Sequence, residues 1–327
     1  MSRISRYQES IEKFIKNKNK IENFKPDTIK HIKQMLDDSD QLCGIVLSTI
    51  LNYNTKKTKY KSHGYYLAFA VNLILIYLKI LENKSNNTID NNIMDLILMD
   101  LLTNIYGLIN DSCGTLKQDT PEKYEEIVKI ILYSNNYFNK HISNILDFSS
   151  KLNTKKMIKS DILNIKDISE NKILVDKLSK MVKLDIVDMK TYIYSKYGTL
   201  GKIIFMLGWV LGGGLLNPDN IKKLESMGEK FGVIYKLCRD FQNIVSDLKT
   251  CSKMSYNMLI NCGINESFIL FMNTKTEFIE ESMALNLYTH TTKEVIDSLE
   301  KNIDNCLEKS NIDMKSSYSS FSCTHKT

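Results

Sequence analysis

The chain has few of the residues that break helices. Its 327 residues include only 3 prolines and 13 glycines. An all-β sandwich or barrel needs many tight turns, and proline and glycine make most of them. Hydrophobic residues make up 43% of the chain, which is enough for a large core. The composition favours an all-helical protein. We expect one domain over residues 1–309 and a disordered Ser/Lys/Thr-rich tail over residues 310–327.

Arginine is also scarce, and charges of one sign do not gather. The chain has a net charge of +6 but only three arginines, Arg3, Arg6 and Arg239. Lysines and acids are mixed along it, without a run of five or six like charges. Proteins that read nucleic acids use arginine forks and basic patches. We therefore expect no nucleic-acid partner.

The seven cysteines form no CxxC pair and have irregular spacing, and the five histidines do not lie near them at zinc-ligand spacing. This pattern indicates reduced thiols in a cytoplasmic protein. The most apolar stretches, residues 65–81 and 203–216, are shorter than the ~18 uninterrupted apolar residues of a membrane span. The N-terminus lacks the apolar region of a signal peptide. We therefore expect no integral membrane segment.

Apolar residues recur at helical spacing over most of the chain. Thr120 and Pro121 form a helix start, and Gly114 and the glycines at 212–214 are expected to stop helices. Residues 82–91 and 149–165 are polar and are predicted to be loops. The predicted helices cover residues 4–23, 27–35, 40–51, 65–81, 93–109, 121–148, 172–183, 185–194, 199–211, 218–249, 264–286 and 291–308.

One segment carries a specific pattern. Residues 224–247 read LESMGEKFGVIYKLCRDFQNIVSD. They resemble the second aspartate-rich helix of the trans-isoprenyl diphosphate synthases, in particular the geranylgeranyl type, whose pattern is roughly LGxxFQIxDDYxNLxS. Lys236 stands at the glutamine of that pattern, Arg239 and Asp240 stand at the acidic pair, and Asn243 keeps its amide.

Four further segments resemble the same family and occur in the same order. Residues 101–114, LLTNIYGLINDSCG, are similar to the helix of the first acidic motif, with Asn110 and Asp111 at its first two acidic positions. The segments at 116–118 (LKQ), 196–200 (KYGTL) and 253–256 (KMSY) are similar to the family's Leu-Arg-Arg, KTGGL and KFSF segments. The resemblance implies an all-α, isoprenoid-synthase-like bundle with a central cavity.

The resemblance also implies a site. Carboxylates on two facing helices would hold Mg²⁺, which neutralises the diphosphate of an allylic prenyl diphosphate, and lysines would bind that diphosphate directly. By this resemblance Asp111 and Asp240 are the catalytic residues. The implied partner is an identical subunit, or an active relative in a heterodimer. The implied metal ligands are Asp111, Asp240, Asn243 and Asp247, and the implied diphosphate-binding residues are Lys117, Lys196, Arg239 and Lys253.

The motifs depart from the family pattern, so three functions stay open. Asp111 is the only acid left in the first motif, Arg239 replaces an acid in the second, and residues 59–64 lack the arginine of the isopentenyl site. The chain could be a divergent prenyl diphosphate synthase. It could be an impaired relative that binds a prenyl diphosphate or regulates an active subunit. It could also ionise an allylic diphosphate as terpene synthases do.

Each candidate residue also has a simpler explanation. Asp111 could end a helix before Gly114, and Arg239 and Asp240 could form a solvated ion pair. Lys196 and Lys253 could each be ordinary surface lysines. A structure separates these readings by showing whether Asp111 and Asp240 face one cavity.

Overall fold

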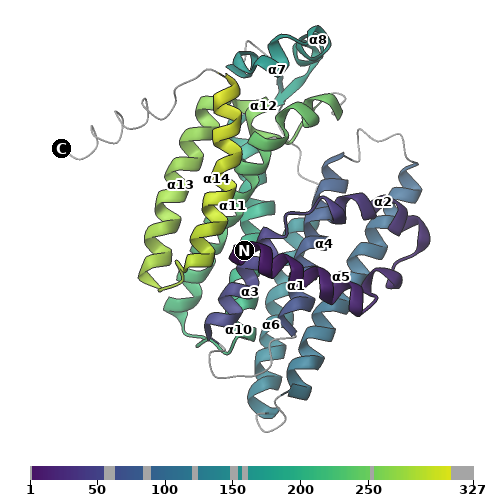
Figure 1. The fold of residues 1–327 in the computed structure, drawn as a ribbon, viewed down its shortest axis with the longest axis vertical. Helices are drawn as coiled ribbons and strands as arrows, with labels where there is room; N and C mark the ends of the chain where they lie inside the picture. Colours follow the sequence, from purple (N-terminus) through teal and green to yellow (C-terminus); the bar gives the residue numbers. More distant parts are fainter. Residues whose placement is uncertain are drawn as a thin grey trace, which may run out of the picture.

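The fold was obtained as a computed structural model, which describes residues 2–54, 63–83, 90–119, 124–147, 154–156, 161–250 and 254–310. Figure 1 shows a bundle of long helices whose upper end carries a group of short elements. The all-α prediction is confirmed, apart from one short pair of strands.

The long helices form the bundle, and most lie close to their predicted bounds. They are α1 (Arg3–Asn17), α2 (Pro26–Asp37), α3 (Leu42–Asn54), α4 (His63–Asn83), α5 (Asn91–Asp119), α6 (Tyr124–Leu146), α10 (Thr199–Leu211), α11 (Pro218–Thr250), α13 (Ile264–Ala284) and α14 (His290–Ser310).

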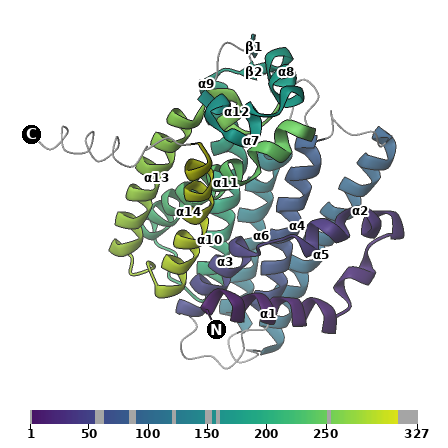
Figure 2. The ribbon, with the colours of Figure 1, turned by 45° about the horizontal axis from the view of Figure 1, so that its top comes forward.

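Two of the short elements, residues 172–180 and 186–193, were predicted as helices over 172–183 and 185–194. The others have three to five residues, too few to show a periodic pattern, and were mostly missed. All the short elements together are the 3₁₀ turns Lys20–Asn23 and Asp161–Asn164, the helices α7 (Lys166–Ser169), α8 (Lys172–Lys180), α9 (Ile186–Ile193) and α12 (Met258–Cys262), the π-helical turn Tyr194–Gly198, and the strands β1 (Thr154–Lys156) and β2 (Val182–Leu184). β1 and β2 pair antiparallel, with Thr154 opposite Leu184. Figure 2 shows β1, β2, α7, α8, α9 and α12 together above the bundle.

Helix α10 lies at the centre of the bundle. Eleven of its thirteen residues are buried, because α3, α6 and α11 surround it. A helix that is apolar on all sides can only be stable in such a position. α4 packs between α3 and α5, while α13 and α14 pack against α11. α11 therefore lies between α10 and the pair α13 and α14. It is the longest helix among the described residues.

Close packing fixes α11 against the π-helical turn Tyr194–Gly198. A Cβ atom on Gly232 would lie 1.8 Å from the carbonyl oxygen of Tyr197. A Cβ on Gly201 would lie 1.8 Å from the carbonyl oxygen of Gly228. Only glycine permits such backbone contact. This contact holds Tyr197 beside the middle of α11.

Two sequence predictions about helix ends need correction or fall outside the structure. Gly114 does not stop its helix, because α5 continues to Asp119 with Gly114 in its interior. The predicted helix start at Thr120–Pro121 lies outside the described residues, as does the predicted tail over residues 310–327, except Ser310, which is the last residue of α14.

Two helices of the described chain are long and apolar enough, by length and composition alone, to cross a membrane. In α4, 67% of that stretch is buried inside the bundle, as expected of a core helix. In α5 the buried share is only 39%. The absence of an integral membrane segment stays a prediction.

Candidate functional site

A cleft opens between α4 and α11 at the upper end of the bundle and encloses about 120 Å³. One wall is α4, and the other is α11 with the loop that precedes α12. The end of α2 and the loop that precedes α3 complete it. The polar and aromatic lining residues are Asp38, Ser39, Asp40, Asn72, Lys79, Glu82, Tyr197, Tyr235, Lys236, Arg239, Asp240, Asn243, Asp247, Thr250, Ser255, Tyr256 and Asn257.

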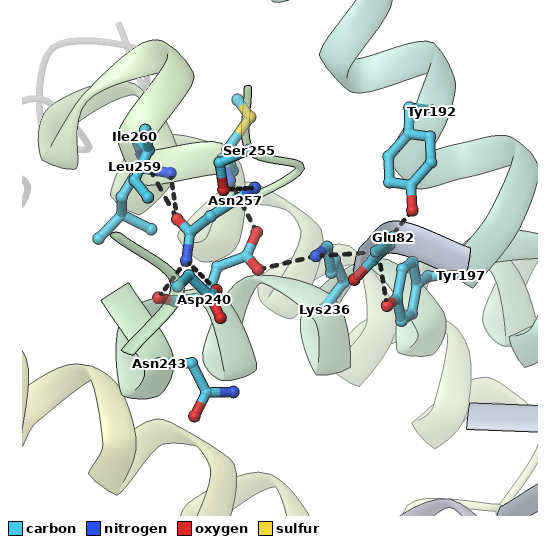
Figure 3. Close-up of polar contacts among 12 residues, drawn as sticks. Glu82, Tyr192, Tyr197, Lys236, Asp240, Asn243, Ser255, Asn257, Leu259 and Ile260 are labelled. Atoms are coloured by element: carbon cyan, nitrogen blue, oxygen red, sulfur yellow. Dashed lines mark hydrogen bonds and ion pairs between the residues drawn. The ribbon is translucent and has the colours of Figure 1, made fainter. Parts of the chain in front are cut away.

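Lys236 joins the two walls of this cleft. Its Nζ lies 2.9 Å from Oδ1 of Asp240, one turn further along α11, and 3.4 Å from Oε1 of Glu82 on α4. Figure 3 shows the ammonium between the two carboxylates. It also lies 5.0 Å from the centre of the Tyr197 ring, a cation–π distance. Burial alone would lower the pKa of Lys236, but Asp240 and Glu82 raise it well above its ordinary value.

Glu82 is the acceptor at which the network converges. Its Oε1 accepts hydrogen bonds from the hydroxyls of Tyr192 at 2.5 Å and Tyr197 at 2.9 Å, in addition to the contact with Lys236. Figure 3 shows both phenol groups pointing at this carboxylate. A buried carboxylate is stable only when such donors replace water.

Asp240 is 2% exposed and has both oxygens in use. Oδ2 accepts the backbone N–H of Met258 at 2.8 Å, and Oδ1 faces Lys236. Burial raises the pKa of Asp240 to about 7, although the charge of Lys236 and the Met258 N–H oppose the rise. Arg239 and Asp240 therefore do not form the solvated pair that the sequence allowed.

Asn257 connects Asp240 to Asp247. Its Nδ2 donates to the backbone carbonyl of Asp240 and to Oδ2 of Asp247, both at 2.9 Å, and its Oδ1 caps α12 through the N–H of Leu259. Burial raises the pKa of Asp247, which the hydrogen bond from Asn257 opposes. Asp247 lines the cleft, as does the half-buried Asn243.

Arg239 turns away from Asp240 and toward the start of α3. Its Nη1 lies 3.4 Å from Oδ2 of Asp40 and 2.7 Å from Oε1 of Gln242. Asp40 also accepts the N–H of Leu42 at the beginning of α3. Arg239 lines the cleft, but its charge is already paired with a carboxylate.

Asp111 does not meet Asp240, so the expected catalytic pair is not formed. Ser112, its neighbour on α5, donates to the backbone carbonyl of His63 at the first residue of α4, whereas Glu82 lies at the other end of α4. At 1.5 Å per residue, the nineteen-residue step from 63 to 82 is about 28 Å long. Asp111 is exposed and pairs with Lys20 at 2.7 Å. The physical reason is that α5 runs antiparallel to α4, which takes this motif to the lower end of the bundle.

The predicted diphosphate-binding lysines do not gather at the cleft. Lys117 is exposed near the end of α5, beyond Asp111. Lys196 is buried, and its Nζ donates to the carbonyls of Asn144, at 2.7 Å, and Asp147 at the end of α6. Burial lowers the pKa of Lys196. Lys253 lies outside the described residues.

Glu82 was not predicted to be a site residue. The Asn-rich composition of residues 82–91 predicted a loop, whereas α4 continues to Asn83. The helical spacing of Lys79 and Glu82, three residues apart at the end of an apolar stretch, was the available signal. For Lys236, the sequence indicated only that a lysine replaces the glutamine of the family pattern.

The donor set of the cleft does not fit a magnesium ion. Mg²⁺ needs near-octahedral oxygen ligands. Both oxygens of Asp240 are occupied, and Glu82 already accepts from two phenols and an ammonium. Among the residues that the structure describes, no three Asp, Glu, His or Cys side chains are grouped so that they could hold a metal.

The cleft is rich in negative charge, and its lining includes a buried polar atom without a hydrogen-bond partner in the described part of the chain. Five carboxylates line it against three cations: Asp38, Asp40, Glu82, Asp240 and Asp247 against Lys79, Lys236 and Arg239. Asn72 is 2% exposed, and its Oδ1 has no hydrogen-bond partner within the described part of the chain. An anion without an accompanying cation would be repelled here.

Comparison with known proteins identifies the fold. No protein-family model matches the chain, and no curated protein sequence matches it significantly. Among solved structures, the geranyltransferase of Helicobacter pylori is similar with a TM-score of 0.54 and 15% identity, over 92% of this chain and 99% of that one. The geranyl diphosphate synthase small subunit of Antirrhinum majus has a TM-score of 0.48 and 14% identity, over 92% of this chain and 100% of that one.

The chain has the all-α fold of the trans-isoprenyl diphosphate synthases, a conclusion that rests on the Helicobacter pylori comparison. At 15% identity the likeness concerns the fold, and the activity has to be argued from the site of this chain.

Proposed function

We propose that this chain is a catalytically silent protein of the isoprenyl diphosphate synthase fold, which acts as a subunit or regulator and not as a prenyltransferase. The observation that carries this proposal is the separation of Asp111 from Asp240 by the length of α4. The carboxylates that do face each other across the cleft, Glu82 and Asp240, are both engaged by Lys236, so an allylic diphosphate has no two-sided metal grip for its leaving group.

The size and charge of the cleft support the same conclusion. Its volume of about 120 Å³ is below the ~300 Å³ at which ligand pockets usually begin. Its carboxylates outnumber its cations, which disfavours a free diphosphate. Arg239 and Lys196, two of the predicted diphosphate ligands, are engaged with Asp40 and with the end of α6.

An activity assay tests this proposal. The protein is incubated with Mg²⁺, geranyl or farnesyl diphosphate and labelled isopentenyl diphosphate, beside an active synthase of the same fold as the positive control. We expect neither a longer labelled product nor released diphosphate. A labelled product would establish the prenyl diphosphate synthase alternative. Diphosphate release without labelled product would establish the terpene-synthase-like alternative.

We further propose that a second chain of the same fold covers the outer face of α5. Ile93, Leu96 and Met99 are 43%, 56% and 67% exposed on successive turns of this helix. Asp100, beside them, is engaged by the backbone N–H of Lys25. Asp95, which is also exposed, borders this apolar strip, and an apolar strip with a polar border is typical of a subunit interface.

Sedimentation velocity tests this second proposal. The double variant Leu96→Asp, Met99→Asp is expected to shift a dimer to a monomer, because it places charges in the apolar strip. Ile173→Asp is the matched control, since Ile173 is 78% exposed but lies on α8. A native monomer that also fails to associate with a co-expressed active synthase would contradict the proposal.

The cytoplasmic location stays part of this proposal. The described cysteines Cys43, Cys113, Cys238, Cys262 and Cys306 are all free thiols, which agrees with a reducing compartment.

A further inference from the structure

The carboxylate of Asp40 lies in the cleft with few close partners for its burial. Its side chain is 22% exposed. The backbone N–H of Leu42 donates to Oδ1 at 3.0 Å, but the Tyr235 hydroxyl and the Arg239 guanidinium both lie 3.4 Å away. Charge-assisted hydrogen bonds are about 2.7–2.9 Å long. Arg239 makes its short contact with Gln242 instead, at 2.7 Å. Asp40 can therefore accept a further donor.

A second acceptor in the cleft has no donor at all. Asn72 of α4 lines the cleft and is 2% exposed, and its Oδ1 has no hydrogen-bond partner among the described residues. Buried polar atoms are nearly always hydrogen-bonded, so an exception indicates a missing partner. The terminal torsion of an asparagine has two broad minima half a turn apart, so either end of the amide can face the cleft.

These two acceptors lie at the same level of the cleft. A Cβ on Gly44 would lie 3.0 Å from the Cβ of Ala68, and a Cβ on Gly64 would lie 3.4 Å from Cδ1 of Leu51. α3 and α4 therefore run antiparallel. Four positions beyond the contact of Gly44 with Ala68, about 6 Å along each chain, are the two acceptors at positions 40 and 72. One small ligand can reach both of them.

The charge and the apolar lining of this end of the cleft favour a small organic cation. Asp38 and Asp40 provide two carboxylates against the single guanidinium of Arg239. α2 ends here, and the C-terminus of a helix attracts cations. Leu75 and Ile76, one turn beyond the asparagine on α4, add an apolar wall. The volume of about 120 Å³ is small for a prenyl chain but holds several non-hydrogen atoms.

We propose that this end of the cleft binds a small primary alkylammonium ion. Its N–H groups donate to Asp40 and Asn72, and its alkyl chain packs on Leu75 and Ile76. A primary ammonium has three N–H donors and stays protonated at neutral pH, as the lysine side chain does. The inference goes beyond the proposed function, since this site needs neither a metal nor a diphosphate.

Titration of the native protein with n-butylamine at neutral pH, followed by saturation-transfer difference NMR, tests this inference. We expect saturable binding with a Kd of about 1 mM or tighter, as so small a ligand allows. Butan-1-ol has the same chain without the charge, and tetramethylammonium has the charge without N–H donors. Each should bind at least about tenfold more weakly. Equal binding of n-butylamine and butan-1-ol would overturn the inference, as would the absence of saturable binding.

Two variants locate the site. Asp40→Asn and Asn72→Leu should each raise the Kd for n-butylamine at least about tenfold. Asn72→Leu should fold at least as stably as the native protein, because it removes an unsatisfied buried oxygen and keeps a similar volume. Glu300→Gln is the matched control, since Glu300 is 24% exposed, pairs with a lysine and lies on α14. Its Kd should equal that of the native protein.

The test stays decisive if one of these variants does not fold. Asp38→Asn, at an exposed position of the same end of the cleft, then replaces it and should raise the Kd about twofold or more. An unchanged Kd in the folded variants would overturn the inference, as would an equal loss of affinity in Glu300→Gln. Prenyl transfer by the native protein would overturn the proposed function without changing these binding outcomes.

Discussion

The carboxylate of Glu82 on α4 lies 3.4 Å from the ammonium of Lys236 on α11, and this contact links the two walls of the cleft. Tyr192 and Tyr197 donate to the same carboxylate oxygen. The network is buried, so its members depend on one another for solvation. Loss of Glu82 would leave two phenol groups and an ammonium short of an acceptor.

We therefore expect Glu82→Ala to lower the free energy of unfolding by about 2–4 kcal/mol. Glu82→Gln keeps an acceptor oxygen for the phenols and should be less damaging. Urea denaturation measures both, with Glu266→Ala at an exposed position of α13 as the control. Equal effects of Glu82→Ala and Glu266→Ala would show that the network contributes nothing to stability.

The raised pKa of Asp240 predicts a pH-dependent stability. The folded state holds a proton on this carboxyl up to a pH of about 7, whereas an unfolded aspartate releases it near its ordinary value of 3.8. Between these values the folded state binds more protons, so its stability falls as the pH rises. The stability of the native protein relative to Asp240→Asn should decline over this window, by about 4 kcal/mol at most.

Thermal or urea unfolding of both proteins between pH 4 and 7 measures this difference. Asp176→Asn is the control, because Asp176 is exposed and pairs with Lys180 on the surface of α8. The relative stability of that variant should stay nearly constant. The prediction would be contradicted if the stability of the native protein relative to Asp240→Asn rose or stayed constant as the pH increased.

Gly232 and Gly114 are predicted to respond in opposite directions to the same substitution. A Cβ at Gly232 would lie 1.8 Å from the Tyr197 carbonyl oxygen, so Gly232→Ala should destabilise the protein by about 3 kcal/mol or more. A Cβ at Gly114 meets nothing within 4 Å. Because glycine weakens a helix interior, Gly114→Ala should stabilise by ~0.5–1 kcal/mol. Urea denaturation measures the free energy of unfolding of both variants. Equal changes in the two variants would contradict the difference in packing around Gly232 and Gly114.

Lys196 is predicted to stabilise the end of α6. Lys196→Met removes the donor to the carbonyls of Asn144 and Asp147 and should lower the free energy of unfolding by about 1–3 kcal/mol. Amide hydrogen exchange should accelerate at the last turn of α6. Lys117→Met, at an exposed lysine of α5, should change the stability by less than ~0.5 kcal/mol. A Lys196 variant as harmless as that control would refute this structural role.

Much of the second motif could be predicted from the sequence. The segment around Phe231 and Gly232 forms the middle of α11, and Arg239, Asp240, Asn243 and Asp247 all line one cleft. The reason is that helical spacing alone places residues 236, 240, 243 and 247 on one face. The bounds of α10 followed in the same way from a continuous apolar stretch that ends at Gly212.

The opposite wall could not be predicted, because it depends on which of two long apolar helices packs against α11. The helix α4 and the helix α5 have similar composition, and sequence spacing does not say which of them faces the cleft. α4 does so, with Glu82 at its C-terminal end, and α5 carries Asp111 to the far end of the bundle. The sequence also did not show that the Lys196 side chain points toward the end of α6. Its direction depends on the π-helical turn in which it lies.

A crystal structure of the native protein grown with Mn²⁺, with diffraction recorded at the manganese absorption edge, shows whether an ammonium or a metal lies between the two walls of the cleft. We expect the Lys236 ammonium between Glu82 and Asp240, within hydrogen-bonding or ion-pair distance of both, and no anomalous peak between these carboxylates. An anomalous peak at that position, with Lys236 turned out of the cleft, would contradict this expectation.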